Sequence, residues 1–306
     1  MPANLASPAA AQRSIRSSRA HWLNRAPLYR VAAGLAGALP RPVRMALAAS
    51  IGDVLARSCR AEAATVRANL ERVVPGIARA ARTRQVREVF RHFAMCFADL
   101  VTSNRAGDAS ALGADEEGRE HVDGALARGG FIVLTAHVGN WELAGRLLVA
   151  RGGSRPVHIV MAPEADPAVE RLLRHGGPAR IVTLRTPTDA IPLIAALRRG
   201  EIVGMQGDRP LGDRGDVAVD LFGAPALFPL GPFLLARAAG VPVLPAFCVL
   251  RVDRRYTVLM HEPLHVERGV EEAALRRWAD GLAAVIARHP TQWFPFGDPW
   301  SVAGAR

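Results

Sequence analysis

The sequence predicts an α/β fold: a largely parallel mixed sheet flanked by helices, preceded by a helical region. Three observations support this prediction. The segment Phe131–Ala136 is a continuous apolar run, which is typical of a strand buried on both faces of a parallel sheet. Further short apolar runs alternate with amphipathic stretches as far as Arg288, as βαβ units require. Residues from about 20 to 110 show arginine-rich repeats at helical spacing instead.

From Gly118 onward the expected elements follow in a regular order. A helix to Arg128 leads through two glycines into the strand at 131–136, and the next helix starts at Trp141. A loop with a short strand is expected over residues 207–223. The other expected strands are 157–162, 180–184, 201–206, 241–250 and 254–261, and the other helices are 166–174, 188–200, 231–239 and 270–288. No long linker interrupts residues 118–306, so we expect one α/β domain that forms a single structural unit with the helical region before it.

The N-terminal third divides into two parts. Residues 1–20 are rich in Ala, Ser and Arg, lack the apolar core of a signal peptide, and are expected to form a flexible tail. Residues 21–117 are expected to form a helical, membrane-associated region. Its most apolar stretch, Leu28–Leu55, is interrupted by charges and prolines, and the pieces are too short to cross a bilayer core of about 30 Å. Two interpretations stay open: the helices lie in the membrane interface, or they simply pack on the domain.

The charge balance favours anionic partners. Lys and Arg total 39 against 28 acidic residues, a net charge of +11, and every basic residue is arginine. A GC-rich genome explains the arginine usage, while the excess charge favours phospholipid surfaces, phosphorylated substrates, acidic carrier proteins or nucleic acid. Three cysteines that are far apart, Cys59, Cys96 and Cys248, suggest neither a disulfide scaffold nor a metal motif and fit a reducing compartment.

The residues that best suggest chemistry follow the strand at 131–136. His137 stands at its carboxyl end, Gly139 and Asn140 suit a turn and a helix cap, and Glu142 lies in the first helical turn. The spacing His-x4-Glu is weak by itself, because about one such match is expected by chance among 9 histidines and 28 acidic residues. Ligands in open α/β sheets collect at the carboxyl ends of strands, so the context favours an acid–base pair.

Three other segments each allow a functional and a structural interpretation. In GDRP, Arg209 could clamp a phosphate with Asp208 orienting it, or both residues could form a turn with a local ion pair. The stretch 221–232, LFGAPALFPLGP, could be a rigid apolar loop that lines a chain-shaped pocket with Phe222 and Gly223, or it could be core. The C-terminal HPTQWFPFGDPW could place its aromatic side chains at a membrane interface or form a plug over the core.

Several motif-based functions are excluded or lack support. HEPLH, from His261 to His265, matches the zinc-protease pattern, but that pattern needs a helix and Pro263 would break it. The sequence contains no GxSxG, Walker or GxGxxG motif, so the hydrolase, NTPase and dehydrogenase classes lack support. We expect no metal and no resident cofactor.

With these blocks in order, the sequence resembles the bacterial late acyltransferases of lipid A biosynthesis, within the lysophospholipid acyltransferase superfamily. The resemblance covers nearly the whole chain, through RANLERVVP, HVGNWE, GDRP, VDLFGAPALFPLGP and QWFPFGDPW. It implies transfer of a fatty acyl group from a thioester of acyl carrier protein or coenzyme A to a hydroxyl of an envelope glycolipid. It also implies a location at the cytoplasmic face of the inner membrane, peripheral or N-terminally anchored, on an anionic surface and without nucleic acid.

The family's His-x4-Asp/Glu pair corresponds to His137 and Glu142. His137 would deprotonate the attacking hydroxyl, and Glu142 would hold the imidazole in the required tautomer. Asn140, Asp208, Arg209, Phe222 and Gly223 are expected to contact substrate, and backbone amides at Gly139–Trp141 or Arg209 could meet the thioester oxyanion. The family often has an arginine-proline step after the next strand, where this chain has Met161-Ala162-Pro163. We expect a nearby arginine, Arg171, Arg174 or Arg180, to supply that charge.

Two alternatives remain at this point. The same catalytic pair could serve an enzyme that acylates glycerol phosphate or a lysophospholipid. A basic protein that binds membranes or nucleic acid would also explain the arginine excess, with His137 and Glu142 as ordinary core residues.

Overall fold

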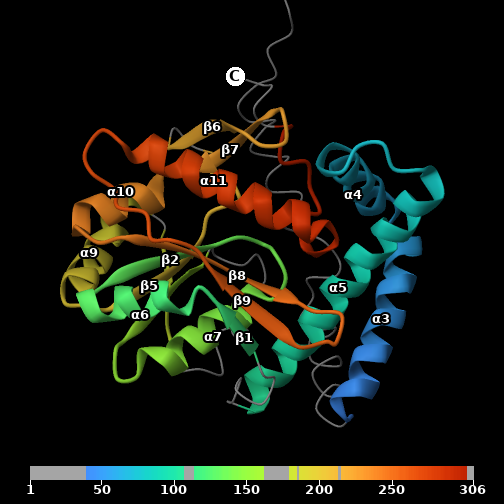
Figure 1. Cartoon of the computed structure of the whole chain (residues 1–306), viewed down its shortest axis with the longest axis horizontal. Helices are drawn as coiled ribbons and strands as arrows, with labels where there is room; N and C mark the ends of the chain where they lie inside the picture. Colours follow the sequence, from blue (N-terminus) through green and yellow to red (C-terminus); the bar gives the residue numbers. More distant parts are fainter. Residues whose placement is uncertain (1–38, 107–113, 162–178, 185, 213–214, 302–306) are drawn as a thin grey trace, which may run out of the picture.

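A computed structural model describes residues 39–106, 114–161, 179–184, 186–212 and 215–301. Seven strands form one mixed sheet in the order β1-β9-β8-β2-β5-β3-β4, and β6 and β7 form a separate hairpin (Figure 1). The strands β8, β2, β5, β3 and β4 run parallel, whereas β9 is antiparallel to β8 and β1 is parallel to β9. The predicted α/β class with a largely parallel mixed sheet is therefore confirmed.

The helices and strands have the following bounds. The sheet contains β1 (Ala114–Glu117), β2 (Phe131–Thr135), β3 (Val157–Met161), β4 (Arg180–Thr183), β5 (Ile202–Gln206), β8 (Val243–Leu250) and β9 (Tyr256–Met260), and the hairpin contains β6 (Asp216–Asp220) and β7 (Pro225–Pro229). The helices are α3 (Arg41–Ser58), α4 (Arg60–Val73), α5 (Arg79–Ala106), α6 (Arg119–Arg128), α7 (Trp141–Gly152), α9 (Ile191–Arg198), α10 (Gly231–Ala239) and α11 (Glu271–Arg288), with short 3-10 turns η4 (Pro187–Ala190) and η5 (Pro290–Gln292).

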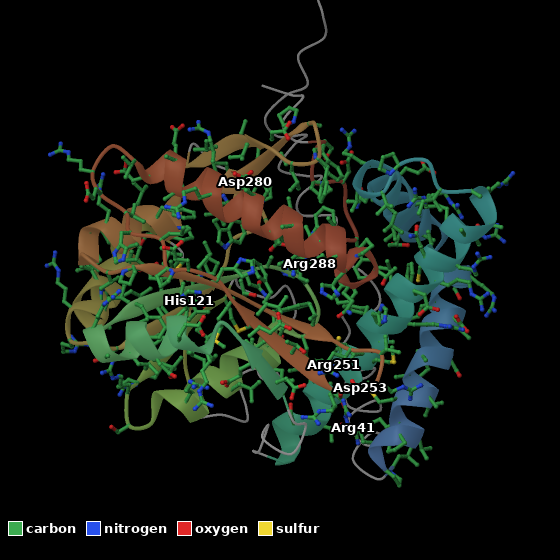
Figure 2. The ribbon with its side chains drawn as sticks, in the orientation of Figure 1. Arg41, His121, Arg251, Asp253, Asp280 and Arg288 are labelled. Atoms are coloured by element: carbon green, nitrogen blue, oxygen red, sulfur yellow. The ribbon has the colours of Figure 1, made fainter. Side chains whose placement is uncertain are left out.

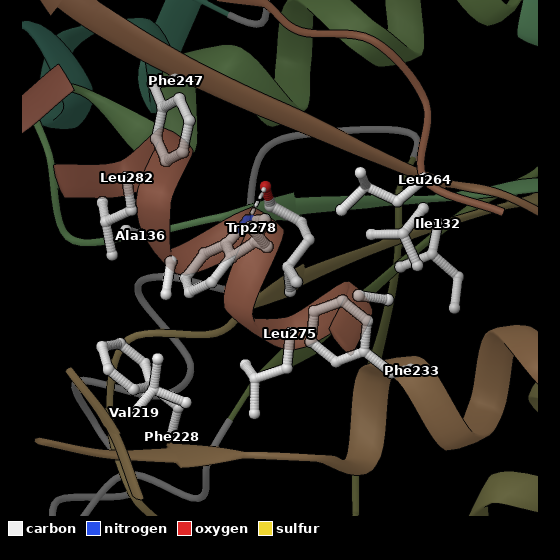
Figure 3. Close-up of a cluster of buried hydrophobic side chains, with 14 of the residues drawn as sticks. Ile132, Ala136, Val219, Phe228, Phe233, Phe247, Leu264, Leu275, Trp278 and Leu282 are labelled. Carbon is white, nitrogen blue, oxygen red and sulfur yellow. Dashed lines mark hydrogen bonds between the residues drawn. The ribbon is translucent and has the colours of Figure 1, made fainter. Parts of the chain in front are cut away.

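The central strand β2 is buried along its whole length because both of its faces are covered. Ile132 and Leu134 point into one core, which they share with side chains of α10 and α11 (Figure 3). Phe131 and Val133 point into a second core on the other face, lined by α5, α6 and α7. In the first core the indole Nε1 of Trp278, on α11, donates a hydrogen bond of 3.3 Å to the carbonyl oxygen of Leu134 (Figure 3). This hydrogen bond holds α11 against β2, the strand that ends two residues before His137.

A helical layer of α3, α4 and α5 stands beside the sheet, at the right of Figure 1. Helix α3 approaches α5 closely at Gly52, where an added Cβ would lie 2.7 Å from the carbonyl oxygen of Phe90. Next to this contact, Arg91 donates two hydrogen bonds of 2.7 and 2.8 Å to the carboxylate of Asp53. Gly52, which has no side chain, permits the close crossing of α3 and α5, and the ion pair fixes the position of one helix along the other.

The structure describes part of the predicted helical region 21–117. Helices α4 and α5 confirm the helical structure that the arginine-rich repeats predict. The last residues of the region are not helical: they form β1, an outer strand of the sheet. Within the described residues, no helix is long and apolar enough to span a bilayer. The predicted tail 1–20 and the predicted helix 166–174 lie outside the described residues.

The structure resolves the alternative interpretations of two segments, residues 221–232 and the C-terminal aromatic segment. The stretch 221–232 is not one loop: it contains the β6–β7 turn, strand β7 and the first residues of α10, and its Leu221, Ala226 and Phe228 are core residues, as the second interpretation expected. Strand β7 pairs with β6 from Asp216↔Pro229 to Asp220↔Pro225. Prolines are tolerated there because they stand at the two ends of the strand. In the C-terminal segment Trp293, Phe294 and Trp300 are buried, so these aromatic side chains form a plug over the core.

The HEPLH segment is not helical. Its Leu264 forms an antiparallel bridge with Val243 at the start of β8. The two histidines of this segment therefore do not share a helical face, as the position of Pro263 predicted.

Candidate active site

Sheet register brings His137 and Asp208 together. Strands β2 and β5 are parallel neighbours, and their last residues, Thr135 and Gln206, are paired. His137 and Asp208 each follow two residues later, so both side chains emerge at the carboxyl edge of the sheet. The backbone N–H of Gly207 continues the ladder with a 2.9 Å bond to the carbonyl of Thr135. Residues 71 positions apart are thus placed side by side by a regular ladder.

The Asp208 carboxylate makes two contacts with His137. Its Oδ1 lies 2.7 Å from the imidazole Nδ1, and its Oδ2 accepts a 2.9 Å hydrogen bond from the backbone N–H of His137. A carboxylate accepts hydrogen bonds, so Nδ1 carries the proton and Nε2 has its lone pair available. This is the tautomer that a general base requires.

Burial and charge keep this pair in the working ionisation state. The His137 side chain is only 8% exposed. Burial, and then the positive charge of Arg209, lower the pKa of His137 below its ordinary value, although Asp208 acts in the opposite direction. Burial alone would raise the pKa of Asp208, but His137 and then Arg209 outweigh it, so the pKa is lowered. At neutral pH the imidazole is neutral and the carboxylate is charged.

The turn after His137 is pinned by backbone contacts. Gly139 has φ +57°, and a Cβ at this position would lie 2.0 Å from the carbonyl oxygen of Cys248. Its N–H donates to the carbonyl of Gln292 at 2.8 Å, and the N–H of Phe294 donates to the carbonyl of His137 at 2.9 Å. The plug segment and β8 therefore hold the catalytic turn from two sides.

Asn140 is the N-cap of α7, as predicted, but its side chain is engaged within the protein. Its Oδ1 accepts from the N–H of Leu143, and its Nδ2 donates to the carbonyl of Cys96 and to the hydroxyl of Tyr256, each at 3.2 Å. Its own N–H donates to the carbonyl of Cys248 at 2.7 Å. Both polar groups of the side chain thus have partners within the fold, and the expected contact with substrate stays a prediction.

Glu142 lies half-buried in the first turn of α7, where the sequence placed it. The carboxylate that the structure joins to Nδ1 of His137 is nevertheless Asp208. The His-x4-Glu spacing predicts that Glu142 orients the ring and that Asp208 contacts the substrate, whereas in the structure Asp208 contacts the ring. A possible signal was that both His137 and Asp208 follow strand ends, which meet whenever the two strands are neighbours.

Two proposed oxyanion donors are likewise engaged. The amide of Gly139 binds the carbonyl of Gln292, and that of Asn140 binds the carbonyl of Cys248. Arg209 is exposed beside the pair, and its charge acts on both members. It therefore remains a candidate for contact with an anion. Arg171 and Arg174 lie outside the described residues. Arg180 is the first residue of β4, the last strand in the sheet order.

Phe222 and Gly223 form the two central residues of the β6–β7 turn. They have φ values of +55° and +77°, and the N–H of Leu221 donates to the carbonyl of Ala224 across the turn. Phe222 packs against the core that includes Trp278. The residues make a tight hairpin turn, and the predicted pocket lining is not tested by these contacts.

The cysteines are poor candidates for a nucleophile. Cys59, Cys96 and Cys248 are free and buried. Burial raises the pKa of each thiol, to about 12 at Cys96. A buried thiol is not a ready nucleophile, because the reactive form is the thiolate. Elsewhere in the described part of the chain, no three His, Cys, Asp or Glu side chains are grouped so that they could hold a metal ion.

Comparison with known proteins adds the family. Residues 16–301 match the model of the bacterial lipid A biosynthesis acyltransferases. The chain belongs to this family. It is an acyltransferase of lipid biosynthesis, which rules out the alternative of a protein that only binds membranes or nucleic acid.

Two relatives by sequence are named for different lipids. A phosphatidylinositol mannoside acyltransferase of Mycobacterium tuberculosis is 32% identical over 225 residues, which cover 71% of this chain and 67% of that protein. The lipid A biosynthesis lauroyltransferase of Escherichia coli is 26% identical over 229 residues, 74% of each chain. The solved 1-acyl-sn-glycerophosphate acyltransferase PlsC of Thermotoga maritima is similar at 17% identity and a TM-score of 0.38, covering 83% of this chain and 99% of that chain.

Proposed function

We propose that this acyltransferase transfers a fatty acyl group from a thioester of acyl carrier protein or coenzyme A to a hydroxyl of an envelope glycolipid. The observation that carries the proposal is the contact of 2.7 Å between Nδ1 of His137 and Oδ1 of Asp208 at the carboxyl edge of the sheet. A neutral imidazole in this tautomer supplies the base that an unreactive alcohol needs.

The chemical step follows from this geometry. Nε2 of His137 removes the hydroxyl proton while the alcohol oxygen attacks the thioester carbonyl carbon. Asp208 stabilises the imidazolium without taking the proton. When the tetrahedral intermediate collapses, the C–S bond breaks and the imidazolium returns its proton to the leaving thiolate. The products are an ester and a free thiol, and no acyl-enzyme is formed.

A glycolipid acceptor is supported by the two relatives. The names of both relatives refer to a glycolipid, a phosphatidylinositol mannoside in one case and lipid A in the other. The exposed Arg209 beside the catalytic pair would suit a phosphate on either the acceptor or the donor. Acylation of glycerol phosphate or a lysophospholipid would use the same catalytic pair and is kept as a competing outcome of the test.

The proposed location is the cytoplasmic face of the inner membrane, where α3 would lie on the lipid. Val43, Leu47, Ile51 and Val54 are 44% to 59% exposed, and their spacing puts them on one face of this helix. Four large apolar side chains in one uncharged stripe suit the interface of a bilayer, and the net charge of +11 favours anionic lipid. Flotation with phosphatidylglycerol vesicles tests this, and Leu47→Asp should reduce binding.

The function is tested with purified protein, labelled acyl thioesters of both carriers, and three acceptors: a glycolipid, a lysophospholipid and glycerol phosphate. We expect acylation of the glycolipid and loss of activity in His137→Ala, with an unchanged circular dichroism spectrum. If His137→Ala keeps its activity, His137 is not the general base. If the enzyme prefers the lysophospholipid or glycerol phosphate, the proposed acceptor is wrong. Lipid mass spectrometry of a deletion strain would then identify the missing acyl chain.

A further inference from the structure

A buried carboxylate joins three elements of the fold. Asp99, on α5, is fully buried. It accepts hydrogen bonds from Arg41 Nη2 at 2.8 Å and from Arg44 Nη2 at 3.2 Å, both on α3, and from the hydroxyl of Tyr256, on β9, at 3.0 Å. Figure 2 shows Arg41 beside the β8–β9 turn, where its Nη2 also donates to the carbonyl of Arg254 at 2.6 Å.

The contacts continue from Asp99 to the catalytic turn. The hydroxyl of Tyr256 donates to Asp99 and accepts a 3.2 Å hydrogen bond from Nδ2 of Asn140. Burial raises the pKa of Tyr256 well above its ordinary value, so the hydroxyl keeps the proton that it donates. Asn140 caps α7 and lies three residues after His137. Two successive hydrogen bonds therefore separate the carboxylate of Asp99 from the end of the catalytic turn.

We propose that Asp99 and Tyr256 are positioning residues for His137, which makes α3 part of the scaffold of the active site. The inference rests on the proposed function, in which His137 is the base. A buried charge with three donors is costly to rearrange, because any movement leaves one of the groups unpaired in a low-dielectric core. The network therefore fixes Asn140, and through it the turn, relative to Asp208.

The molecule contains a matched control for this network. His158 and Glu201 form another buried pair, with Nε2 and Oε2 2.6 Å apart. Glu201 directly precedes β5 and His158 lies near the start of β3, so this pair stands at the amino ends of the parallel strands. Like Asp99, Glu201 is a buried carboxylate bound by side-chain donors, but it lies at the opposite end of the parallel strands from His137. Its loss should cost stability without displacing the catalytic imidazole.

The test compares Tyr256→Phe with Glu201→Gln in the full-length enzyme. Tyr256 is buried and touches no substrate in the proposed reaction, so we expect unchanged KM values. We expect kcat to fall about tenfold or more, since a displacement of about 1 Å costs on the order of 100-fold. The acid limb of the kcat profile should move to higher pH as the imidazole loses burial. Asp99→Asn should also lower kcat and move the acid limb to higher pH. If Asp99→Asn does not fold, the result for Tyr256→Phe decides the test.

Two results would overturn the inference: a kcat for Tyr256→Phe within threefold of the parent, or a loss of kcat that Glu201→Gln reproduces at the same loss of thermal stability. The proposed function has its own control in His137→Ala. If that variant is inactive while Tyr256→Phe is normal, the function stands and the positioning role fails. If His137→Ala is active, the proposed function itself fails.

Discussion

Asp208→Asn tests which carboxylate orients the catalytic imidazole. The substitution keeps the shape of the side chain but replaces one oxygen with an amide nitrogen. In the native pair Oδ2 accepts from the backbone N–H of His137 at 2.9 Å, and Oδ1 faces Nδ1 at 2.7 Å. The remaining oxygen of Asn should keep the backbone bond, which turns its NH2 group toward the ring. Nδ1 must then accept, so the ring proton moves to Nε2 and the base is lost.

The expected magnitude follows from these two contacts. Loss of one charge-assisted hydrogen bond is worth about 1.5–3 kcal/mol, or roughly 10- to 150-fold in rate. A forced change of tautomer is more severe, about 10⁴-fold in serine proteases with the equivalent substitution. We therefore expect kcat to fall by roughly 10²- to 10⁴-fold with little change in KM.

The assay measures kcat and KM for acyl transfer from a labelled thioester, with thermal unfolding as the check on folding. Glu142→Gln is the matched control, because Glu142 is the carboxylate that sequence spacing assigned to the same task. The reasoning about Asp208 is wrong if Asp208→Asn stays within tenfold of the parent while Glu142→Gln loses most of its activity.

Two further predictions concern charge and backbone geometry. Arg209 lowers the pKa of the catalytic imidazole, so Arg209→Gln should raise that pKa and move the acid limb of kcat/KM to higher pH. Rate profiles between about pH 5 and 8 would measure the move, and a limb that stays in place or moves to lower pH contradicts it. Gly139→Ala should destabilise the protein by about 2–5 kcal/mol, because φ is +57° and the new Cβ would lie 2.0 Å from the carbonyl oxygen of Cys248. Denaturant unfolding tests this, and a loss below about 1 kcal/mol would show that the turn relaxes.

Local features of the site were predictable from the sequence. The apolar run at 131–136, the Gly-Asn turn and the amphipathic stretch that follows correctly predicted β2, the turn and α7. Asn140 was correctly predicted as the cap, because capping depends on a residue and its own neighbours. Its contacts with Cys96 and Tyr256 depend on α5 and β9 and were not predictable from local spacing.

The structure of two segments could not be predicted from their composition: the proline-containing strand β7 and the C-terminal aromatic segment. Prolines at 225 and 229 suggested a loop, although a strand tolerates them at its ends. Aromatic side chains near the C-terminus suit both a membrane interface and a core plug, and burial of Trp293, Phe294 and Trp300 decides for the plug. Composition cannot separate these alternatives, since burial depends on what packs against a side chain.

By itself the sequence determined most of the strands and helices from β2 onward, although not β1 or β7, together with the excess of arginine and the position of a histidine at a strand end. These properties belong to short stretches of chain or to the whole composition. The tertiary structure decided which acid serves that histidine. A 2.7 Å contact between side chains 71 positions apart exists only because β2 and β5 are neighbours in register, and pairing of strands is a property of the assembled sheet.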